Sequence, residues 1–152
     1  MLLSKVIKLL DDYKTKNYTD VEIEGISYNS LQTKPKDIFL CIRGEATDGH
    51  KYAKSAVEKG AKALFCEEEL DINVPQIIVK DTKRTMAKIA SAFYNNPSKE
   101  INLIGVTGTN GKTTVTHLIQ RIIEENNEKC ALIGTLGYKL SSNDEYKEAK
   151  HT

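Results

Sequence analysis

The stretch that decides how this chain of 152 residues folds is Gly105-Val106-Thr107-Gly108-Thr109-Asn110-Gly111-Lys112-Thr113-Thr114. It follows an apolar run, Ile101 to Val106, and precedes a segment of helical spacing that begins near Lys112. Glycines let successive backbone N–H groups converge on a ligand, and a helix N-terminus adds unpaired donors and the positive end of its dipole. We therefore predict a strand, a phosphate-binding loop and a helix that together bind a nucleoside triphosphate.

Two side chains of this stretch have expected roles. Lys112 is placed to meet the β- and γ-phosphates, and the Thr113 hydroxyl is placed to join the coordination shell of a bridging Mg²⁺. The general pattern G-x-x-x-x-G-K-[ST] asks for glycine where this chain has Val106, with Gly105 one place early. The alternative is a glycine-rich turn with a solvated lysine. The apolar run before the loop and the helix after it favour nucleotide binding.

The residues upstream of this stretch alternate between strand and helix patterns. Residues 38–42 form a continuous apolar run with the length of a strand buried on both faces, and two further strands of this kind are expected over residues 61–66 and 76–79. Helical spacing of apolar residues recurs in three segments: residues 2–10, 51–59 and 82–95. Residues 21–26 alternate like a short strand, Gly60 is expected to end a helix, and Asn96-Pro97 breaks the last one. The pattern predicts an α/β sandwich over residues 1–97.

A second unit is expected over residues 98–152. Its predicted elements are the strand at 101–106, the phosphate loop, a helix to about Asn126 and a strand over 129–133. Two strands and one helix bury too little apolar surface for stability, because an isolated strand pair is marginal in water. We therefore expect this unit to be the opening of a nucleotide-binding domain, in a chain that looks cut short.

Composition limits the classes of partner. The chain is 39% hydrophobic and 28% charged with a formal net charge of +1, so it offers no electrostatic case for nucleic acid or an anionic membrane. The composition does not exclude small polar or anionic ligands. Cys41, Cys66 and Cys130 form no C-x-x-C pair, which favours reduced thiols in a cytoplasmic protein. No segment has the length of a membrane span or the pattern of a signal peptide.

The decisive stretch resembles the signature of the Mur ligases, ATP-dependent ligases that build the peptide of bacterial cell-wall precursors, G-x-T-G-T-N-G-K-T-T. The resemblance accounts for the early glycine. It extends upstream through short motifs in the family's order: Asn29-Ser30, Lys34-Pro35, Asp37-Ile38-Phe39, Gly44, Asp48-Gly49-His50 and Gly60-Ala61. The segment Ile133 to Tyr138 is similar to the branch that adds the third residue of the peptide. Lys36, where a glycine is usual, and Leu31, where a basic residue often stands, depart from the pattern.

The resemblance implies a reaction. ATP phosphorylates the terminal carboxylate of UDP-N-acetylmuramoyl-L-alanyl-D-glutamate, and the amine of a diamino acid attacks the acyl phosphate to form an amide. Family members have three domains, for the UDP-sugar-peptide, ATP and the incoming amino acid. This chain would hold the first domain (1–97), the beginning of the second (98–152) and none of the third, so we expect no ligase activity from it alone.

The resemblance also implies site residues. The expected ATP cradle is Gly108, Thr109, Asn110, Gly111, Lys112, Thr113 and Thr114, with Lys112 catalytic and Thr113 on Mg²⁺. The expected contacts to the UDP-sugar-peptide are Ser30, Glu45, Ala46, Thr47, His151 and Thr152. Without the resemblance, Ser30 reads equally well as a turn-forming hydroxyl. His50 is expected to make local hydrogen bonds, and His117, on the helix behind the loop, is expected to pack. Glu67 to Glu69 are expected to form a solvated face rather than a metal site.

Two other readings stay open. The chain could be a stand-alone module that binds a nucleotide or UDP-sugar, or part of a sibling ligase such as the dipeptide-adding or folate-type member. The segment Gly134 to Tyr138 argues against the sibling. The residues that choose the diamino acid would lie in the third domain, so the sequence leaves that choice open.

Overall fold

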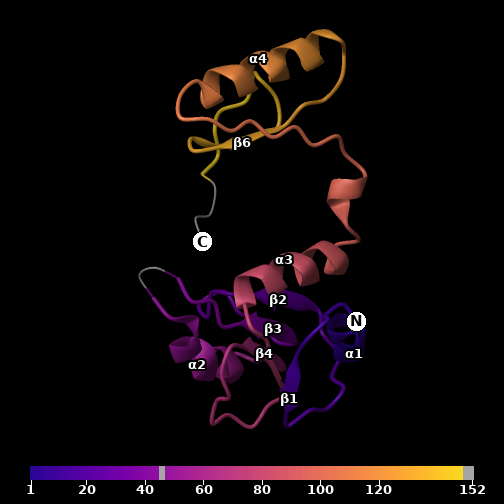
Figure 1. Cartoon of the computed structure of the whole chain (residues 1–152), viewed down its shortest axis with the longest axis vertical. Helices are drawn as coiled ribbons and strands as arrows, with labels where there is room; N and C mark the ends of the chain where they lie inside the picture. The colour runs from indigo at the N-terminus through magenta and orange to yellow at the C-terminus, as the bar shows by residue number, and fades with distance from the viewer. Residues whose placement is uncertain (45–46, 149–152) are drawn as a thin grey trace. The chain divides into compact units, whose positions relative to one another are not determined.

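Two units make up the chain, Met1–Ile101 and Asn102–Thr152, in a computed structural model that describes residues 1–44 and 47–148 (Figure 1). Both contain helices and strands, so the predicted α/β class is confirmed. None of the helices in these described ranges is both long and apolar enough to cross a lipid bilayer.

A five-stranded sheet lies at the centre of the first unit. Its strands are β1 (Lys14–Lys16), β2 (Gly25–Ser27), β3 (Asp37–Leu40), β4 (Ala63–Cys66) and β5 (Gln76–Ile78). They are ordered β1-β5-β4-β3-β2, with β2 to β5 parallel and β1 antiparallel at one edge. In the register, Leu64 lies between Phe39 and Gln76. Parallel neighbours require crossover connections: α2 lies in the one from β3 to β4, whereas the connections from β2 to β3 and from β4 to β5 are loops without a helix.

Helices cover both faces of this sheet. They are α1 (Leu3–Ile7), α2 (Ala53–Glu58) and α3 (Thr82–Phe93), with short 3₁₀ turns η1 (Gly49–Tyr52) and η2 (Pro97–Lys99). Side chains alternate along β3, so Ile38 and Leu40 join a core with α1 and α3, whereas Phe39 joins a second core with α2. All four residues of β3 and of β4 are buried. The prediction of strands buried on both faces is therefore confirmed.

Two tight turns place the start of β3 against the end of α2. Gly60 adopts a φ of +104°, and the bonds from Gly60 N to Val57 O and from Ala61 N to Ala56 O close a Schellman motif. The predicted helix stop is thus confirmed. Lys36 N donates to Gly60 O at 2.9 Å, and Lys36 itself has a φ of +66°. Glycine adopts this left-handed conformation most easily, which gives a physical reason for the glycine that the resemblance led us to expect there.

The first unit also departs from its predicted elements in two places. The exposed strand β1, of sequence Lys-Thr-Lys, was not expected, because three polar residues carry no pattern that predicts their pairing with β5. The alternation over 21–26 yields regular pairing only from Gly25, while Glu22 makes an isolated bridge to Leu2. In both places, pairing with a distant segment decides the strand and local pattern does not.

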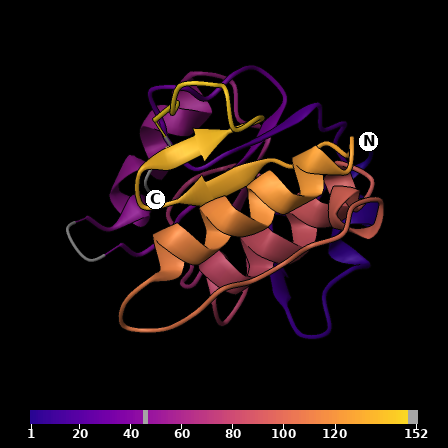
Figure 2. The same ribbon diagram turned by 90° about the horizontal axis from the view of Figure 1, so that it is seen from above.

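The second unit contains α4 (Lys112–Glu125) and a hairpin of β6 (Leu132–Gly134) and β7 (Gly137–Lys139) that lies along the helix (Figure 2). The predicted helix is confirmed. The predicted strand over 101–106 is wrong, because these residues have no pairing partner among those described and Leu103 is 79% exposed. A strand is stabilised by its neighbours, and β6 pairs with β7 instead. The strand expected over 129–133 begins only at Leu132, the one buried apolar side chain described in this unit.

Candidate functional site

The predicted phosphate loop in the second unit is an exposed turn with two glycines in left-handed conformations. Gly108 has a φ of +149° and Gly111 a φ of +78°, a region that side chains with a Cβ rarely adopt. Gly105 has neither a positive φ nor any atom within 4 Å of an added Cβ. The backbone geometry thus requires glycine at two of the three positions.

Helix α4 begins directly at the end of this loop. Gly111 is its N-cap and contributes no side chain, so the first N–H groups of the helix remain available as donors. The Lys112 ammonium group folds back and donates to the carbonyl oxygens of Gly108 and of Thr109, the latter at 3.3 Å. Among the described residues the Thr113 hydroxyl makes no hydrogen bond. Free N–H groups, a cation and a free hydroxyl at one helix end fit a phosphate–Mg²⁺ ligand.

A hollow of about 470 Å³ lies beside the first turns of α4, and it is lined by Thr113, Thr114, His117, Leu118, Arg121, Lys139 and Ser142. Arg121 and Lys139 give this hollow positive charge. The Lys139 ammonium is held by Ser142 O at 3.2 Å and lies 5.3 Å from the centre of the Tyr146 ring. His117 Nε2 and the Tyr146 hydroxyl are 2.7 Å apart, and the two rings pack edge to face, as expected for a histidine that packs.

In the first unit, Ser30 lies in a turn that follows β2 at the carboxyl edge of the sheet. Asn29 Oδ1 accepts a hydrogen bond from Leu31 N at 2.9 Å, and Thr33 Oγ1 donates to Asn29 O at 3.2 Å. Thr33 Oγ1 also lies 3.0 Å from Ser27 Oγ. Ser30 is only 8% exposed, yet among the described residues its hydroxyl has no hydrogen-bond partner. Asn29 and Thr33 shape this turn through their hydrogen bonds, and the Ser30 hydroxyl takes no part in them.

A second turn, between Arg43 and Gly49, follows β3 at the same edge. Arg43 and Asp48 form an isolated antiparallel bridge, and Gly49 N donates to Ile42 O at 2.8 Å. A Cβ at Gly49 would lie 2.6 Å from Ile42 N, so the close approach of two backbones requires a glycine there. Gly44 N donates to Thr47 O at 2.8 Å. This closure places Thr47 at the carboxyl edge, where ligands of parallel α/β sheets bind.

His50 joins this turn to the end of β4. Its Nδ1 lies 2.6 Å from Asp48 Oδ1, and its Nε2 accepts a hydrogen bond from Glu67 N at 2.9 Å. Its side chain is 4% exposed. Hydrogen bonds from the His50 backbone and ring, together with the Arg43 charge, hold the pKa of the Asp48 carboxyl below its usual range. The expectation that His50 makes local hydrogen bonds is confirmed.

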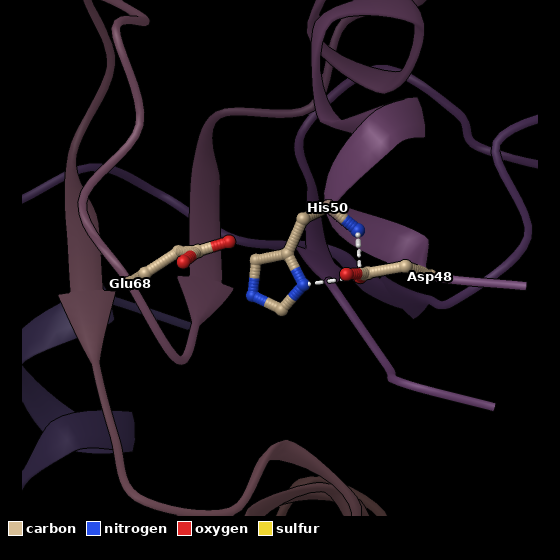
Figure 3. Close-up of side chains that lie close together, drawn as sticks. All are labelled: Asp48, His50 and Glu68. Carbon is tan, nitrogen blue, oxygen red and sulfur yellow. Dashed lines mark hydrogen bonds and ion pairs between the residues drawn. The ribbon is translucent and has the colours of Figure 1, made fainter.

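The ligand atoms of Asp48, His50 and Glu68 lie within 4.8 Å of one another, which raises the question of a metal ion. Figure 3 shows the two carboxylates on either side of the His50 ring, with dashed lines to Asp48 alone. Arg43 already pairs with both, with Nε 3.4 Å from Asp48 Oδ2 and one terminal nitrogen 3.0 Å from Glu68 Oε1. A guanidinium between the carboxylates and a histidine with both nitrogens engaged argue against a cation.

Glu67 is not part of a solvated face, which corrects the expectation for residues 67–69. Its side chain is 18% exposed, and its Oε1 accepts a hydrogen bond from Thr82 N at 3.0 Å, at the start of α3. Its Oε2 lies 3.5 Å from Arg43. Sequence reasoning missed Arg43 and Glu67, because the contacts join segments far apart along the chain. Glu68 and Glu69, at 57% and 66% side-chain exposure, do face solvent.

The predicted site residues therefore fall into three groups. The seven residues of the ATP cradle, Gly108 to Thr114, lie together in the second unit, and Ser30 and Thr47 lie at the carboxyl edge of the sheet in the first. Glu45, Ala46, His151 and Thr152 lie outside the described residues.

Comparison with known protein families gives two matches. The profile described as "Mur ligase family, catalytic domain" matches residues 22–94, and "Mur ligase middle domain" matches residues 106–152. Among curated relatives, a UDP-N-acetylmuramoyl-L-alanyl-D-glutamate--2,6-diaminopimelate ligase of Listeria monocytogenes is 42% identical over 152 residues, all of this chain. A Clostridioides difficile protein of the same name is 44% identical over 137 residues, 90% of the chain. The chain spans about 30% of the length of the first relative and 28% of the second.

Solved structures show a similar fold. A diaminopimelate ligase of the same name superposes with a TM-score of 0.63 and 27% identity, covering 79% of this chain and 26% of that one. MurF from Acinetobacter baumannii gives a TM-score of 0.65 at 22% identity, and the match covers 88% of this chain and 30% of that one. At this identity the similarity shows the fold alone. MurF from Thermotoga maritima, solved in complex with ADP, gives a TM-score of 0.51 at 26% identity, and the match covers 66% of this chain and 23% of that one.

Proposed function

The chain belongs to the Mur ligase family, and we propose that it is the front part of a ligase that adds a diamino acid to UDP-N-acetylmuramoyl-L-alanyl-D-glutamate. The relatives that match the whole chain carry that substrate in their names, together with 2,6-diaminopimelate. Residues 1–97 would bind the UDP-sugar-peptide, and residues 98–152 would begin the ATP-binding domain. The protein would work in the cytoplasm, where it would catalyse a step of peptidoglycan synthesis.

The reaction divides into activation and attack. The γ-phosphoryl group of ATP is transferred to the terminal carboxylate of the substrate, which gives an acyl phosphate and ADP. The amine of the diamino acid then attacks the acyl carbon, the C–O bond to phosphate breaks, and an amide, phosphate and a proton are released. Such phosphoryl transfers depend mainly on positioning and on electrostatic stabilisation.

The phosphate loop would carry the activation step. The N–H groups of the turn and of the start of α4 would bind the phosphate oxygens, held in place by the left-handed Gly108 and Gly111. Lys112 would exchange its bonds to the loop carbonyls for the β- and γ-phosphates. The Thr113 hydroxyl would help to hold Mg²⁺, which neutralises charge as the phosphoryl group moves.

The carboxyl edge of the first unit would bind the UDP end of the substrate. Ser30 offers a nearly buried hydroxyl with no partner among the described residues, in a turn fixed by its neighbours. Thr47 stands on the adjoining turn after β3. Glu45 and Ala46, and His151 and Thr152 toward the sugar-peptide, are proposed from the family resemblance only.

The single observation that carries the proposal is the phosphate loop, complete in sequence and with left-handed glycines at 108 and 111. The test is a ligase assay on the complete product of the gene, with ATP, Mg²⁺, UDP-N-acetylmuramoyl-L-alanyl-D-glutamate and diaminopimelate. Phosphate release that needs all of these, and that Lys112→Met abolishes while Lys83→Met on α3 leaves intact, supports the proposal. A complete product that binds UDP or ATP and releases no phosphate would leave a binding module instead.

A further inference from the structure

The His50 ring has one possible protonation state in this structure. Glu67 N is a backbone N–H and can only donate, so Nε2 of His50 must be the acceptor and carry no proton. A neutral imidazole then carries its proton on Nδ1, where it donates to Asp48 Oδ1 at 2.6 Å. Both nitrogens are therefore used inside the protein, and with 4% side-chain exposure the ring has no polar atom left for a ligand.

These two hydrogen bonds connect segments that follow different strands. Asp48 closes the turn after β3, since it forms the bridge to Arg43 and caps η1 by accepting from His50 N. Glu67 follows β4, and its carboxylate accepts from Thr82 N at the start of α3. The Thr82 hydroxyl lies 3.1 Å from Cys41 O, back at the end of β3. His50 thus completes a closed set of contacts along the carboxyl edge of the sheet.

We propose that His50 is a positioning residue for the sugar-nucleotide site: as the neutral Nδ1–H tautomer it fixes the turn after β3 to the end of β4, so that the carboxyl edge is preorganised for a uridine diphosphate group. This inference rests on the function proposed above. It assigns His50 an indirect role, distinct from contact with the ligand and from metal ligation. A site held in its binding geometry loses less conformational entropy when the ligand arrives.

The tautomer is tested by a long-range ¹H–¹⁵N spectrum of the histidine side chains at neutral pH. The expected result is a protonated Nδ1 and an unprotonated Nε2 for His50. A protonated Nε2 would contradict the bond from Glu67 N and overturn the proposal.

The role in binding is tested by calorimetric titration of the chain with UDP, using variants that keep one bond each. His50→Asn can retain a donor near the Nδ1 position, His50→Gln an acceptor near the Nε2 position, and His50→Phe neither. We expect His50→Phe to weaken UDP binding about tenfold at a temperature where circular dichroism shows it folded, with the other two variants in between. Lys54→Gln, on the exposed side of α2, serves as the matched control and should bind like wild type.

The outcomes separate the two proposals. Unchanged affinity in a folded His50→Phe variant would show that the ring does not position the site. Equal weakening in all three variants, with no partial recovery, would indicate direct contact and would also overturn the inference. A wild-type chain that does not bind UDP would instead refute the proposed sugar-nucleotide site, whatever the spectrum shows of His50.

Discussion

Replacing Gly60 by alanine should destabilise the first unit strongly, and the structure separates two causes. The φ of +104° lies in the left-handed half of the map, where a Cβ costs about 1–2 kcal/mol. The added Cβ would also lie 2.8 Å from the Cα atom of Pro35. Because that contact is with backbone, no rotamer change relieves it, and overpacking of this kind costs about 1–3 kcal/mol.

Together these costs predict a loss of roughly 2–5 kcal/mol in the free energy of unfolding for Gly60→Ala. For a domain of this size, each kcal/mol shifts Tm by about 4–8 °C, so Tm should fall by at least roughly 8 °C. Urea unfolding followed by far-UV circular dichroism measures the change. Gly60→Asn should lose less, because asparagine tolerates the left-handed conformation but keeps the clash.

Gly105→Ala is the matched control, since an added Cβ there meets no atom within 4 Å and no positive φ is involved. It should leave the stability of the chain nearly unchanged. A loss below about 1 kcal/mol for Gly60→Ala would refute the reasoning, because the φ cost alone should exceed it. An equal loss for the alanine and asparagine variants would assign the whole effect to the clash.

Three further predictions concern thiol reactivity, hydrogen exchange and acid stability. With a thiol reagent at about pH 8, the partly exposed Cys130 should react rapidly. Cys41 and Cys66 are buried, and burial raises the pKa of both thiols, that of Cys66 to about 11, so both should react only after denaturation. Rapid reaction of all three thiols would contradict this. Amides of α4 should exchange with solvent far faster than those of β3 and β4, because Leu132 is the one buried apolar side chain described in the second unit; equal protection would contradict the small core. The Asp48 carboxyl, its pKa lowered chiefly by hydrogen bonds from His50, stabilises the fold when ionised. That contribution is complete above the unfolded pKa of about 4 and disappears as pH falls through the lower folded value. Asp48→Asn should therefore lower Tm at neutral pH, with a gap to wild type that closes in acid; a gap that widens in acid would show the opposite sign.

The elements that the sequence predicts well are those whose signal is local. The buried strands β3, after Asp37, and β4 are continuous apolar runs, α4 follows a glycine-rich loop, and Gly60 ends α2 by its own backbone preference. In each case the sequence pattern that predicts the element lies in the residues that form it or directly beside them. The glycine-rich loop before α4 also has a local signal, within ten consecutive residues, and its binding of ATP stays a prediction.

Features that depend on distant partners were missed or misplaced. An apolar run at 101–106 has the composition of a strand, but without a neighbouring strand among the described residues it does not form one. The polar strand β1 forms because β5 pairs with it. The contacts of Arg43 with Glu67, and of His50 with the same segment, join residues about twenty positions apart. Neither the hydrophobic periodicity nor the secondary-structure propensity of the sequence predicts such contacts.

Two amide titrations of the 152-residue chain followed in ¹H–¹⁵N spectra, one with UDP and one with Mg²⁺ and ATP, would test the assignment of one nucleotide site to each unit. UDP should shift the amides near Ser30 and Thr47 and leave the phosphate loop unchanged. ATP with Mg²⁺ should shift residues 108–114 and leave those near Ser30 unchanged. If ATP leaves the loop amides in place, or if UDP shifts only those of the loop, the assignment of two nucleotide sites to two units is contradicted.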